Sequence, residues 1–298
     1  MKSKFFTAER IMPRVTRISG MGGELCYLVE GDGAALLIDG LTGVGSLKAF
    51  VRELTDRPVT LAATHGHIDH VGAAWEYGEV CINPRDIPLM YSPMHAAVEA
   101  RLDFVGSRGG RGPKRETEPT EADVPPARPV VTYPLFEGDA FDLGGVRLEV
   151  IEVPGHTEGT VVFLDRAARV VYSGDACNLN TLLNLPGATS IARYRESLLH
   201  FKAYQGDFDV MYGGHGPVAV PNTIIDDGIA LCDRILAGTD DAVAVPSLAP
   251  GRTGRLAARR GDSFLPLAGG LCNIVYAENG VTNPPCPPVT GVSILRRG

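Results

Sequence analysis

Thr64-His65-Gly66-His67-Ile68-Asp69-His70 is the stretch that decides the fold of this chain. Four of its seven residues carry side chains that bind metal ions, which is too dense for an ordinary solvated turn. The stretch directly follows a short apolar segment, residues 59–63, that has the length and composition of a β-strand. Ligands placed where a strand runs out into a loop are typical of α/β sites. The stretch therefore predicts a metal site at the C-terminal end of a strand.

The composition of the chain is that of an ordinary globular protein. Its 298 residues are 44% hydrophobic and 21% charged. The net charge of −7 gives no overall positive field, so we expect a small-molecule substrate and no nucleic acid or membrane as a partner. The sequence has neither a signal peptide nor the ~20 apolar residues of a spanning helix, and this predicts a cytoplasmic protein. Its six cysteines include no C-x-x-C pair and are expected to be free thiols. Whether the chain forms a homo-oligomer is left open.

Strands and helices are expected to alternate along most of the chain. Apolar or β-rich segments predict strands at residues 15–18, 24–30, 34–39, 59–63, 80–82, 130–133, 146–153, 160–164, 169–173, 209–212 and 272–276. Helical spacing predicts helices at residues 45–54, 71–77, 84–104 (in two pieces broken near Pro93), 191–204 and 223–236.

We expect one domain over residues 1–298, because no linker composition divides the chain. Residues 106–129 differ in kind, since they are first basic and glycine-rich and then acidic and proline-rich. Such a segment is expected to bury little apolar surface, so it is either a plain loop or a lid over the site. A C-terminal extension, richer in proline and glycine, begins at about residue 242.

Three further loops resemble the first in kind. Each follows an expected strand and places a glycine beside a potential ligand, and these ligands are His156, Asp175 and His215. Glycine at such points lets the backbone bend sharply and approach a bound ion closely. Imidazole nitrogen suits zinc and similar cations, whereas a carboxylate can bridge two ions. The remaining histidines, His95 and His200, fall in expected helices and are predicted to be surface or packing residues.

The spacing of the ligands favours two neighbouring ions. His65 and His67 converge on one ion if the loop bends at Gly66, and Asp69 and His70 then face a second ion. The expected ligands are His65, His67 and His156 for the first ion and Asp69, His70 and His215 for the second, with Asp175 between the two.

These motifs together resemble those of the metallo-β-lactamase superfamily, and the resemblance covers residues 15–236. It implies an α/β (α+β) fold, a four-layer αββα sandwich of two mixed β-sheets flanked by helices, with the metal site at one edge of the sheets. It also implies two Zn²⁺ ions per chain, held by the seven ligands above, with Asp175 bridging them; iron or manganese are the alternatives. The family has an aspartate that supports the ligand loop at the end of an early strand, and Asp39 matches it.

The chain departs from several branches of the family. True β-lactamases of this fold have no bridging aspartate at the position where this chain has Asp175, and this difference argues against antibiotic hydrolysis. The acyl-homoserine lactonases have a tyrosine where this chain has Asn178, and flavo-diiron oxidoreductases have a glutamate where it has His67. The subfamily is therefore left open.

Two ions about 3.5–4 Å apart would hold a bridging water and lower its pKa toward ~7, so that hydroxide is available at neutral pH. The catalytic residues would be Asp69, which orients this nucleophile or passes a proton, and the bridging Asp175. Asn178 can donate a hydrogen bond to a substrate oxygen. Met21 lies in a glycine turn where the family has an apolar flap near the metals, and it is the second candidate for substrate contact.

The leading hypothesis is a zinc-dependent hydrolase that cleaves an ester, thioester or lactone of a small molecule. A metal-dependent phosphodiesterase is the alternative within the hydrolases, because the same two-metal geometry serves phosphoryl transfer. A mononuclear iron enzyme of the persulfide-dioxygenase type is a third hypothesis, and it would leave the second metal site empty.

Overall fold

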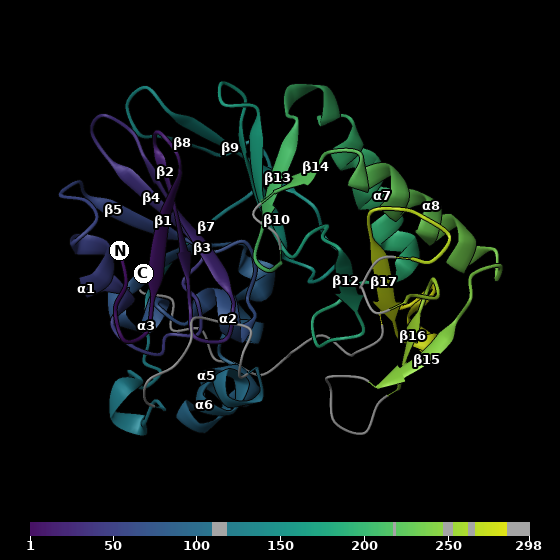
Figure 1. Cartoon of the computed structure of the whole chain (residues 1–298), viewed down its shortest axis with the longest axis horizontal. Coiled ribbons are helices and arrows are strands. Elements are labelled where there is room, and N and C mark those ends of the chain that lie inside the picture. The colour runs from purple at the N-terminus through teal and green to yellow at the C-terminus, as the bar shows by residue number, and fades with distance from the viewer. Residues whose placement is uncertain (109–117, 217–218, 247–252, 262–265, 285–298) are drawn as a thin grey trace.

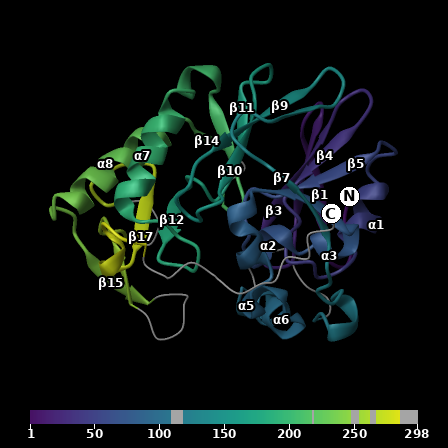
Figure 2. The same cartoon turned by 180° about the vertical axis from the view of Figure 1, so that it is seen from behind.

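The computed structural model describes residues 1–108, 118–216, 219–246, 253–261 and 266–284. Its strands form three sheets. Two of them lie side by side in the centre of the molecule with helices on their outer sides, and the third extends beyond the second (Figures 1 and 2). The αββα sandwich of two mixed sheets is therefore confirmed, and a third, smaller sheet is added to it.

The first sheet has seven strands in chain order. Pairs from β1 to β4 are antiparallel hairpins, whereas pairs from β4 to β7 are parallel. Parallel neighbours need long crossover connections, and the helices between these strands supply them. The strands are β1 (Thr7–Met12), β2 (Val15–Ser19), β3 (Leu25–Glu30), β4 (Ala35–Ile38), β5 (Val59–Ala62), β6 (Glu79–Ile82) and β7 (Val131–Pro134).

Short helices cover this sheet. The first begins at an N-cap serine, Ser46, whose side chain accepts a hydrogen bond from the backbone N–H of Ala49. The third ends at Gly78, which has the left-handed conformation (φ 82°) that glycine adopts readily. The helices are α1 (Leu47–Arg52), α2 (Ile68–Val71), α3 (Ala74–Tyr77), α4 (Ile87–Met90), α5 (Pro93–Ala96) and α6 (Val98–Ser107), with 3₁₀ turns η1 (Pro84–Asp86) and η2 (Glu121–Asp123).

The second sheet has six strands in the order β14-β13-β11-β10-β9-β8. Its only parallel pair among the described residues is β11 with β13, and the crossover between them contains α7. The strands are β8 (Ala140–Asp142), β9 (Arg147–Glu152), β10 (Val161–Asp165), β11 (Val170–Gly174), β13 (Val210–Gly213) and β14 (Val220–Pro221); its outer helices are α7 (Ile191–Lys202) and α8 (Ile224–Leu236), with the 3₁₀ turn η3 (Gln205–Asp207).

The third sheet joins the C-terminal extension to the middle of the chain. Its strands are β12 (Asn180–Leu183), β15 (Val243–Pro246), β16 (Thr253–Leu256) and β17 (Asn273–Tyr276), followed by the 3₁₀ turn η4 (Glu278–Gly280). The strand from the middle of the chain, β12, lies at the edge of this sheet and pairs in parallel with β17 over four residues. The extension predicted from residue 242 is thus an integral part of the fold, and of its strands only β17 was predicted.

Three apolar cores hold the layers together. One lies between the two central sheets and contains Tyr27 and Tyr172, whose ring centroids are 5.4 Å apart. A second lies between the first sheet and its helices and includes Phe50 and Trp75. The third lies between the second sheet, α7 and α8, and includes Phe201. Burying one such side chain contributes roughly 1.5–3 kcal/mol, so each core can hold its layer in place.

Some predicted elements have different boundaries. The helix expected at residues 71–77 is two short helices that begin within the ligand stretch, at Ile68. The helix expected at 84–104 does break near Pro93, which starts α5, but it breaks again at Ala97, where the backbone is extended (ψ 141°). Strands β1, β8, β12, β14, β15 and β16 were not predicted, because most of them are short and lack a clear apolar alternation.

The excursion at residues 106–129 is described only in part, since residues 109–117 lie outside the described residues. Its described second half, residues 118–129, is mostly exposed, and Val124 is the one buried residue in it. Val124 is buried and packs in a small apolar cluster with Met21, Val44 and Val105. Five cysteines are free and buried, as expected, and the sixth, Cys286, lies outside the described residues.

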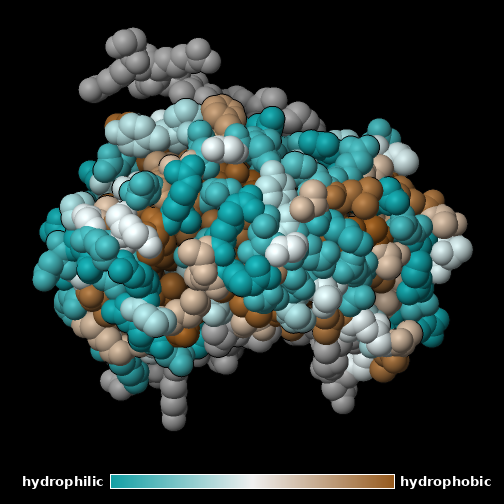
Figure 3. Space-filling view, turned by 90° about the horizontal axis from the view of Figure 1, so that it is seen from above, coloured by the Kyte–Doolittle hydropathy of each residue, from teal (hydrophilic) through white to brown (hydrophobic). Residues whose placement is uncertain are grey.

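The face that lies at the top of Figure 1 is mostly hydrophilic, with hydrophobic residues in separate small areas (Figure 3). Within the described part of the chain, no helix has the length and apolar character needed to cross a membrane.

Candidate metal centre

The four ligand loops meet where strands of both central sheets end. The stretch at 64–70 follows β5, His156 follows β9, Asp175 follows β11, and His215 follows β13. The side chains of all seven predicted ligands come together there, and only His215 exposes a substantial part of its side chain, 24%. Because the first two strands named belong to different sheets, the site can form only when the sheets pack against each other.

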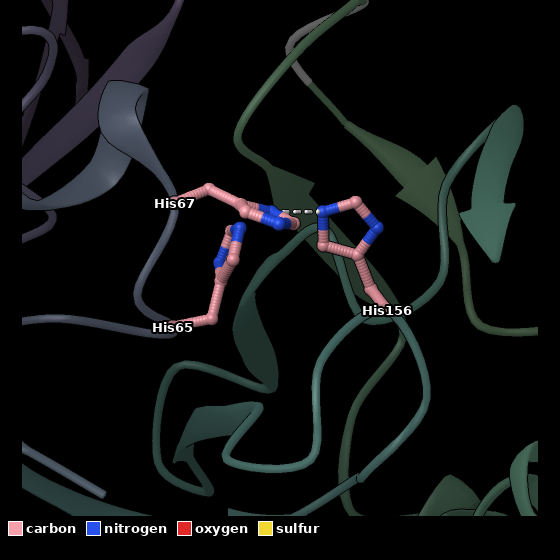
Figure 4. Close-up of side chains that lie close together, drawn as sticks. All are labelled: His65, His67 and His156. Atoms are coloured by element: carbon pink, nitrogen blue, oxygen red, sulfur yellow. Dashed lines mark hydrogen bonds between the residues drawn. The ribbon is translucent and has the colours of Figure 1, made fainter. Parts of the chain in front are cut away.

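The ligand atoms fall into the predicted groups. His65, His67 and His156 place one nitrogen each within 4.8 Å of the others (Figure 4). Asp69, His70 and His215 form a second group, whose ligand atoms also lie within 4.8 Å of one another. Asp175 forms a third group with His65 and His70, one residue from each of the other two. This position between the groups is the one expected of a bridging carboxylate.

The hydrogen bonds of the first group fix which nitrogen of each ring is free to bind an ion. His67 donates through Nε2 to the carbonyl of Pro186 (3.0 Å), and His156 donates through Nδ1 to the carbonyl of Leu182 (2.7 Å). The remaining nitrogens, Nδ1 of His67 and Nε2 of His156, face each other at 2.8 Å. Nδ1 of His65 lies 3.0 Å from the hydroxyl oxygen of Thr64, so Nε2 of His65 is the nitrogen that is free to bind an ion.

Two ring nitrogens of the ligands are buried without any hydrogen-bond partner: Nε2 of His65 and Nε2 of His70. A buried polar atom without a partner costs about 1–3 kcal/mol, and a metal ligand bond would remove that cost. The donor set of imidazoles and carboxylates is one that divalent transition metals bind. The residues therefore fit a divalent metal centre with room for two ions.

Burial and charge set the protonation of the two groups differently. Burial lowers the pKa of His65, His67 and His156, so these rings are neutral at neutral pH, which is the form that binds a metal. Burial also acts to lower the pKa of His70, but the carboxylates of Asp39 and Asp69 outweigh it and raise the pKa to about 10.

The carboxylates of the site are held in their ionised form. Burial acts to raise the pKa of Asp69, but His70 and His215 outweigh it and hold the pKa well below its usual range. Burial opposes ionisation of Asp175 in the same way, and His215 and His70 again lower its pKa. Asp69 also pairs with His215, with Oδ2 of the carboxylate 2.9 Å from Nε2 of the ring.

Asp39, where the resemblance implies a supporting aspartate, contacts two residues of the ligand stretch, Thr64 and His70. Its Oδ1 accepts hydrogen bonds from the backbone N–H (2.7 Å) and the hydroxyl (3.0 Å) of Thr64. Its Oδ2 lies 2.8 Å from Nδ1 of His70, which leaves Nε2 of that ring for an ion. Asp39 itself has a positive φ of 68°, a conformation that aspartate tolerates better than most residues.

One glycine beside the ligands has no room for a side chain. A Cβ at Gly214 would lie 2.5 Å from Cε1 of His70 and 3.0 Å from Oδ1 of Asp175. The glycine next to His215 in the sequence is therefore required for the close approach of this loop to the second group, and not only for a turn.

The two candidate substrate contacts are engaged within the protein. Asn178 donates through Nδ2 to Oδ1 of Asp175 (3.3 Å) and accepts the backbone N–H of Asn180 (3.0 Å). Met21 is 3% exposed and packs in the apolar cluster with Val44. A substrate contact by either side chain stays a prediction.

Three residues near the centre were not predicted to have a role. Asp86 joins two of the ligand loops, and Tyr194 donates through its hydroxyl to the carbonyl of Ala176 (2.8 Å). His95, predicted to be a surface or packing residue, is buried with its ring edge-on to His67, at 5.3 Å between centroids. His200, in contrast, is exposed on α7 as expected. Asp86, Tyr194 and His95 could not be recognised from the sequence, since none of them lies in a dense motif.

The family model described as the metallo-beta-lactamase superfamily matches residues 20–215. This is more than half of the chain, and the chain belongs to that superfamily. The three ligand groups all lie within the part of the chain that this model matches.

Similar proteins include acyl-coenzyme A thioesterases. The chain is 28% identical over 178 residues to the acyl-coenzyme A thioesterase MBLAC2 of Gallus gallus, a match that covers 56% of this chain and 62% of that protein. For the Homo sapiens protein of the same name, the identity is 25% over 180 residues, with 56% and 63% covered. The chain thus matches less than two thirds of the length of these relatives. An uncharacterized protein of Mycobacterium leprae is 29% identical over 202 residues, with 64% and 85% covered.

Solved structures share the fold at low identity. A metallo-beta-lactamase from Pontibacter korlensis superimposes with a TM-score of 0.53 at 18% identity, covering 76% of this chain and 99% of that one. The sec-alkylsulfatase Pisa1 from Pseudomonas sp. gives a TM-score of 0.56 at 17% identity, covering 78% and 42%. At these identities the likeness shows the fold alone.

Proposed function

We propose that the chain is a zinc-dependent hydrolase that cleaves the thioester bond of a small acyl thioester, such as an acyl-coenzyme A. The observation that carries the proposal is the complete pair of ligand groups with Asp175 between them. The similarity to proteins named acyl-coenzyme A thioesterases directs the choice among ester, thioester and lactone toward the thioester.

The roles of the residues follow from their grouping. His65, His67 and His156 would hold one zinc ion, Asp69, His70 and His215 the other, and Asp175 both. When bound, zinc ions in such a centre activate water for attack and polarise a carbonyl oxygen.

Asp69 would orient the attacking water. Its pKa is held well below the usual range, so it is ionised and can accept a hydrogen bond from that water. Its contact with His215 fixes the direction of one oxygen, Oδ2, which leaves Oδ1 for this task.

Positive charge near the centre supports an anionic small molecule as the substrate. The guanidinium of Arg108 lies over the ring of Phe104, 4.2 Å from its centroid, at the end of α6. It contributes to the lowered pKa of Asp69, after His70 and His215. A coenzyme A thioester carries phosphate groups that such an arginine can bind.

The complete second ligand group favours a two-metal hydrolase over a mononuclear iron dioxygenase. That enzyme type needs one ion and three protein ligands, whereas this chain brings together Asp69, His70 and His215 in addition to the first group. A phosphodiesterase would use the same two-metal geometry, so a substrate assay and not the structure distinguishes it from a thioesterase.

The test is hydrolysis by zinc-loaded protein of four substrates: an acyl-coenzyme A, a lactone, a carboxylic ester and a bis-phosphodiester. We expect the thioester to be cleaved fastest, with loss of activity in His67→Ala. His200→Ala is the matched control, because this histidine is exposed on α7 and lies in neither ligand group. Preferred cleavage of the phosphodiester, or one iron per chain in place of two zinc, would refute the proposal.

A further inference from the structure

We propose that Asp86 is a positioning residue for the first ligand group, His65, His67 and His156, whereas Asp39 contacts a ligand of the second group, His70, directly and reaches the first group only through Thr64. Of these two buried carboxylates, Asp86 would then be the one whose loss weakens the first group alone. This inference rests on the metal centre of the proposed function and not on the thioester as its substrate.

Asp86 fastens two ligand loops that are far apart in the sequence. It lies in η1 and is 1% exposed. Its Oδ2 accepts hydrogen bonds from the backbone N–H of Gly66 (2.7 Å) and the hydroxyl of Thr157 (2.6 Å). Its Oδ1 accepts the backbone N–H of Gly159 (2.8 Å).

These three donors are neighbours of the first-group ligands. Gly66 lies between His65 and His67, and Thr157 directly follows His156. One carboxylate therefore sets the distance between the loop that carries two of these ligands and the loop that carries the third. Hydrogen bonds that orient the supports of metal ligands typically change metal affinity 10–100-fold when they are lost.

The space around the Asp86 side chain is an independent sign of close fit. A Cβ at Gly159 would lie 2.6 Å from Cγ of Asp86, and a Cβ at Gly66 would lie 3.0 Å from its Cβ. Both loops approach the aspartate more closely than any side chain would allow. The two glycines and the carboxylate thus form one packed unit behind the first group.

The second group is supported by other residues. Asp39 accepts a hydrogen bond from Nδ1 of His70 (2.8 Å). The loop of His215 is held from the first sheet, where Tyr27 donates through its hydroxyl to the carbonyl of Gly213 (2.6 Å) and Leu25 donates its N–H to the carbonyl of Gly214 (2.8 Å). None of these contacts includes Asp86.

The experiment measures zinc affinity at each group separately, by competition with a chromophoric chelator. His215→Ala leaves the first group intact, and His67→Ala leaves the second. In the His215→Ala background, Asp86→Asn should weaken zinc binding about 10–100-fold, because an amide offers one acceptor oxygen where the carboxylate accepts three donors. In the His67→Ala background, Asp86→Asn should leave the affinity unchanged, whereas Asp39→Asn should weaken it.

Thr157→Val removes a single donor and serves if Asp86→Asn does not fold, as judged by circular dichroism. It should produce a smaller loss that is again confined to the first group. Asp103→Asn, an exposed carboxylate on α6, is the matched control and should change neither affinity. Equal weakening of both groups by the variants at 86 and 157, or no weakening of the first, would overturn the inference.

The zinc measurement needs no substrate, so its outcome is separate from that of the proposed function. Protein that divides its zinc affinities as described but cleaves no thioester would refute the thioesterase assignment and leave the role of Asp86 intact.

Discussion

Adding one methyl group at Gly214 is expected to damage the second ligand group without removing any ligand. The new Cβ would lie 2.5 Å from Cε1 of His70 and 3.0 Å from Oδ1 of Asp175. Carbon atoms in contact are normally about 3.5–4.0 Å apart, so the overlap with the ring is on the order of 1 Å.

The backbone of Gly214 cannot easily move away to relieve this overlap. Its N–H donates to the carbonyl of Gly174 (2.9 Å), and its carbonyl accepts the N–H of Leu25 (2.8 Å). The ring of His70 must therefore shift. Overpacking of this kind costs about 1–3 kcal/mol of stability, and a misplacement of about 1 Å at a catalytic site can cost roughly 10²-fold in rate.

We therefore expect Gly214→Ala to lower kcat about a hundredfold while the protein stays folded. The assay is thioester cleavage followed by thiol release, together with zinc content and a thermal melt. Gly206→Ala is the control, because a Cβ there meets nothing within 4 Å. A Gly214→Ala protein with full activity and two zinc ions would refute the reasoning, since it would mean that the ring of His70 is free to move.

Three further outcomes are expected. Removing metal with a chelator should lower the melting temperature, and zinc at about 100 times its Kd should restore about 2.7 kcal/mol of stability; a melt that does not respond to zinc contradicts the metal centre. Arg108→Ala should raise KM for an acyl-coenzyme A at least several-fold but leave KM unchanged for a short thioester that lacks phosphates; an equal change for both would exclude phosphate recognition by this residue. Tyr194→Phe should cost about 0.5–1.5 kcal/mol in a denaturant titration, because the carbonyl of Ala176 loses its 2.8 Å hydrogen bond while the ring still fills its space; unchanged stability would mean that water replaces the hydroxyl.

The ligands of the metal centre could be predicted from the sequence because metal chemistry restricts residue types. Histidine and aspartate are rare enough that four of them within seven residues form a dense signal. The loops of His156, Asp175 and His215 carry the same signal in weaker form, each beside a glycine and after a strand. The strands before these three loops, β9, β11 and β13, run in the same direction in the second sheet, so their carboxyl ends lie at one edge of it. The stretch at 64–70 follows β5 of the first sheet, and its meeting with the other loops was implied by the family resemblance and not by the spacing.

The residues that hold the ligands in place could not be predicted in the same way. Asp86 and Tyr194 bond mainly to backbone N–H and C=O groups of the ligand loops, and every residue of the chain has such groups. Their partners therefore leave no pattern in the sequence. Asp39 was an exception only because the family resemblance supplied its role.

The third sheet was missed for a related reason, and it changes how the C-terminal extension is understood. Strand β12 pairs with β17 in parallel across about ninety residues of sequence. Such a pairing has no local turn from which it could be predicted. Leu182 of β12 is paired with Val275 and also accepts the Nδ1 hydrogen bond of His156 at 2.7 Å. That hydrogen bond fixes the ring so that Nε2 faces the first ligand group. The C-terminal strand therefore supports a metal ligand through one intervening strand. A substitution that disrupts the pairing of β17 should therefore change the orientation of His156 and weaken metal binding. This effect is expected even though no residue of β17 belongs to a ligand group in the described part of the chain.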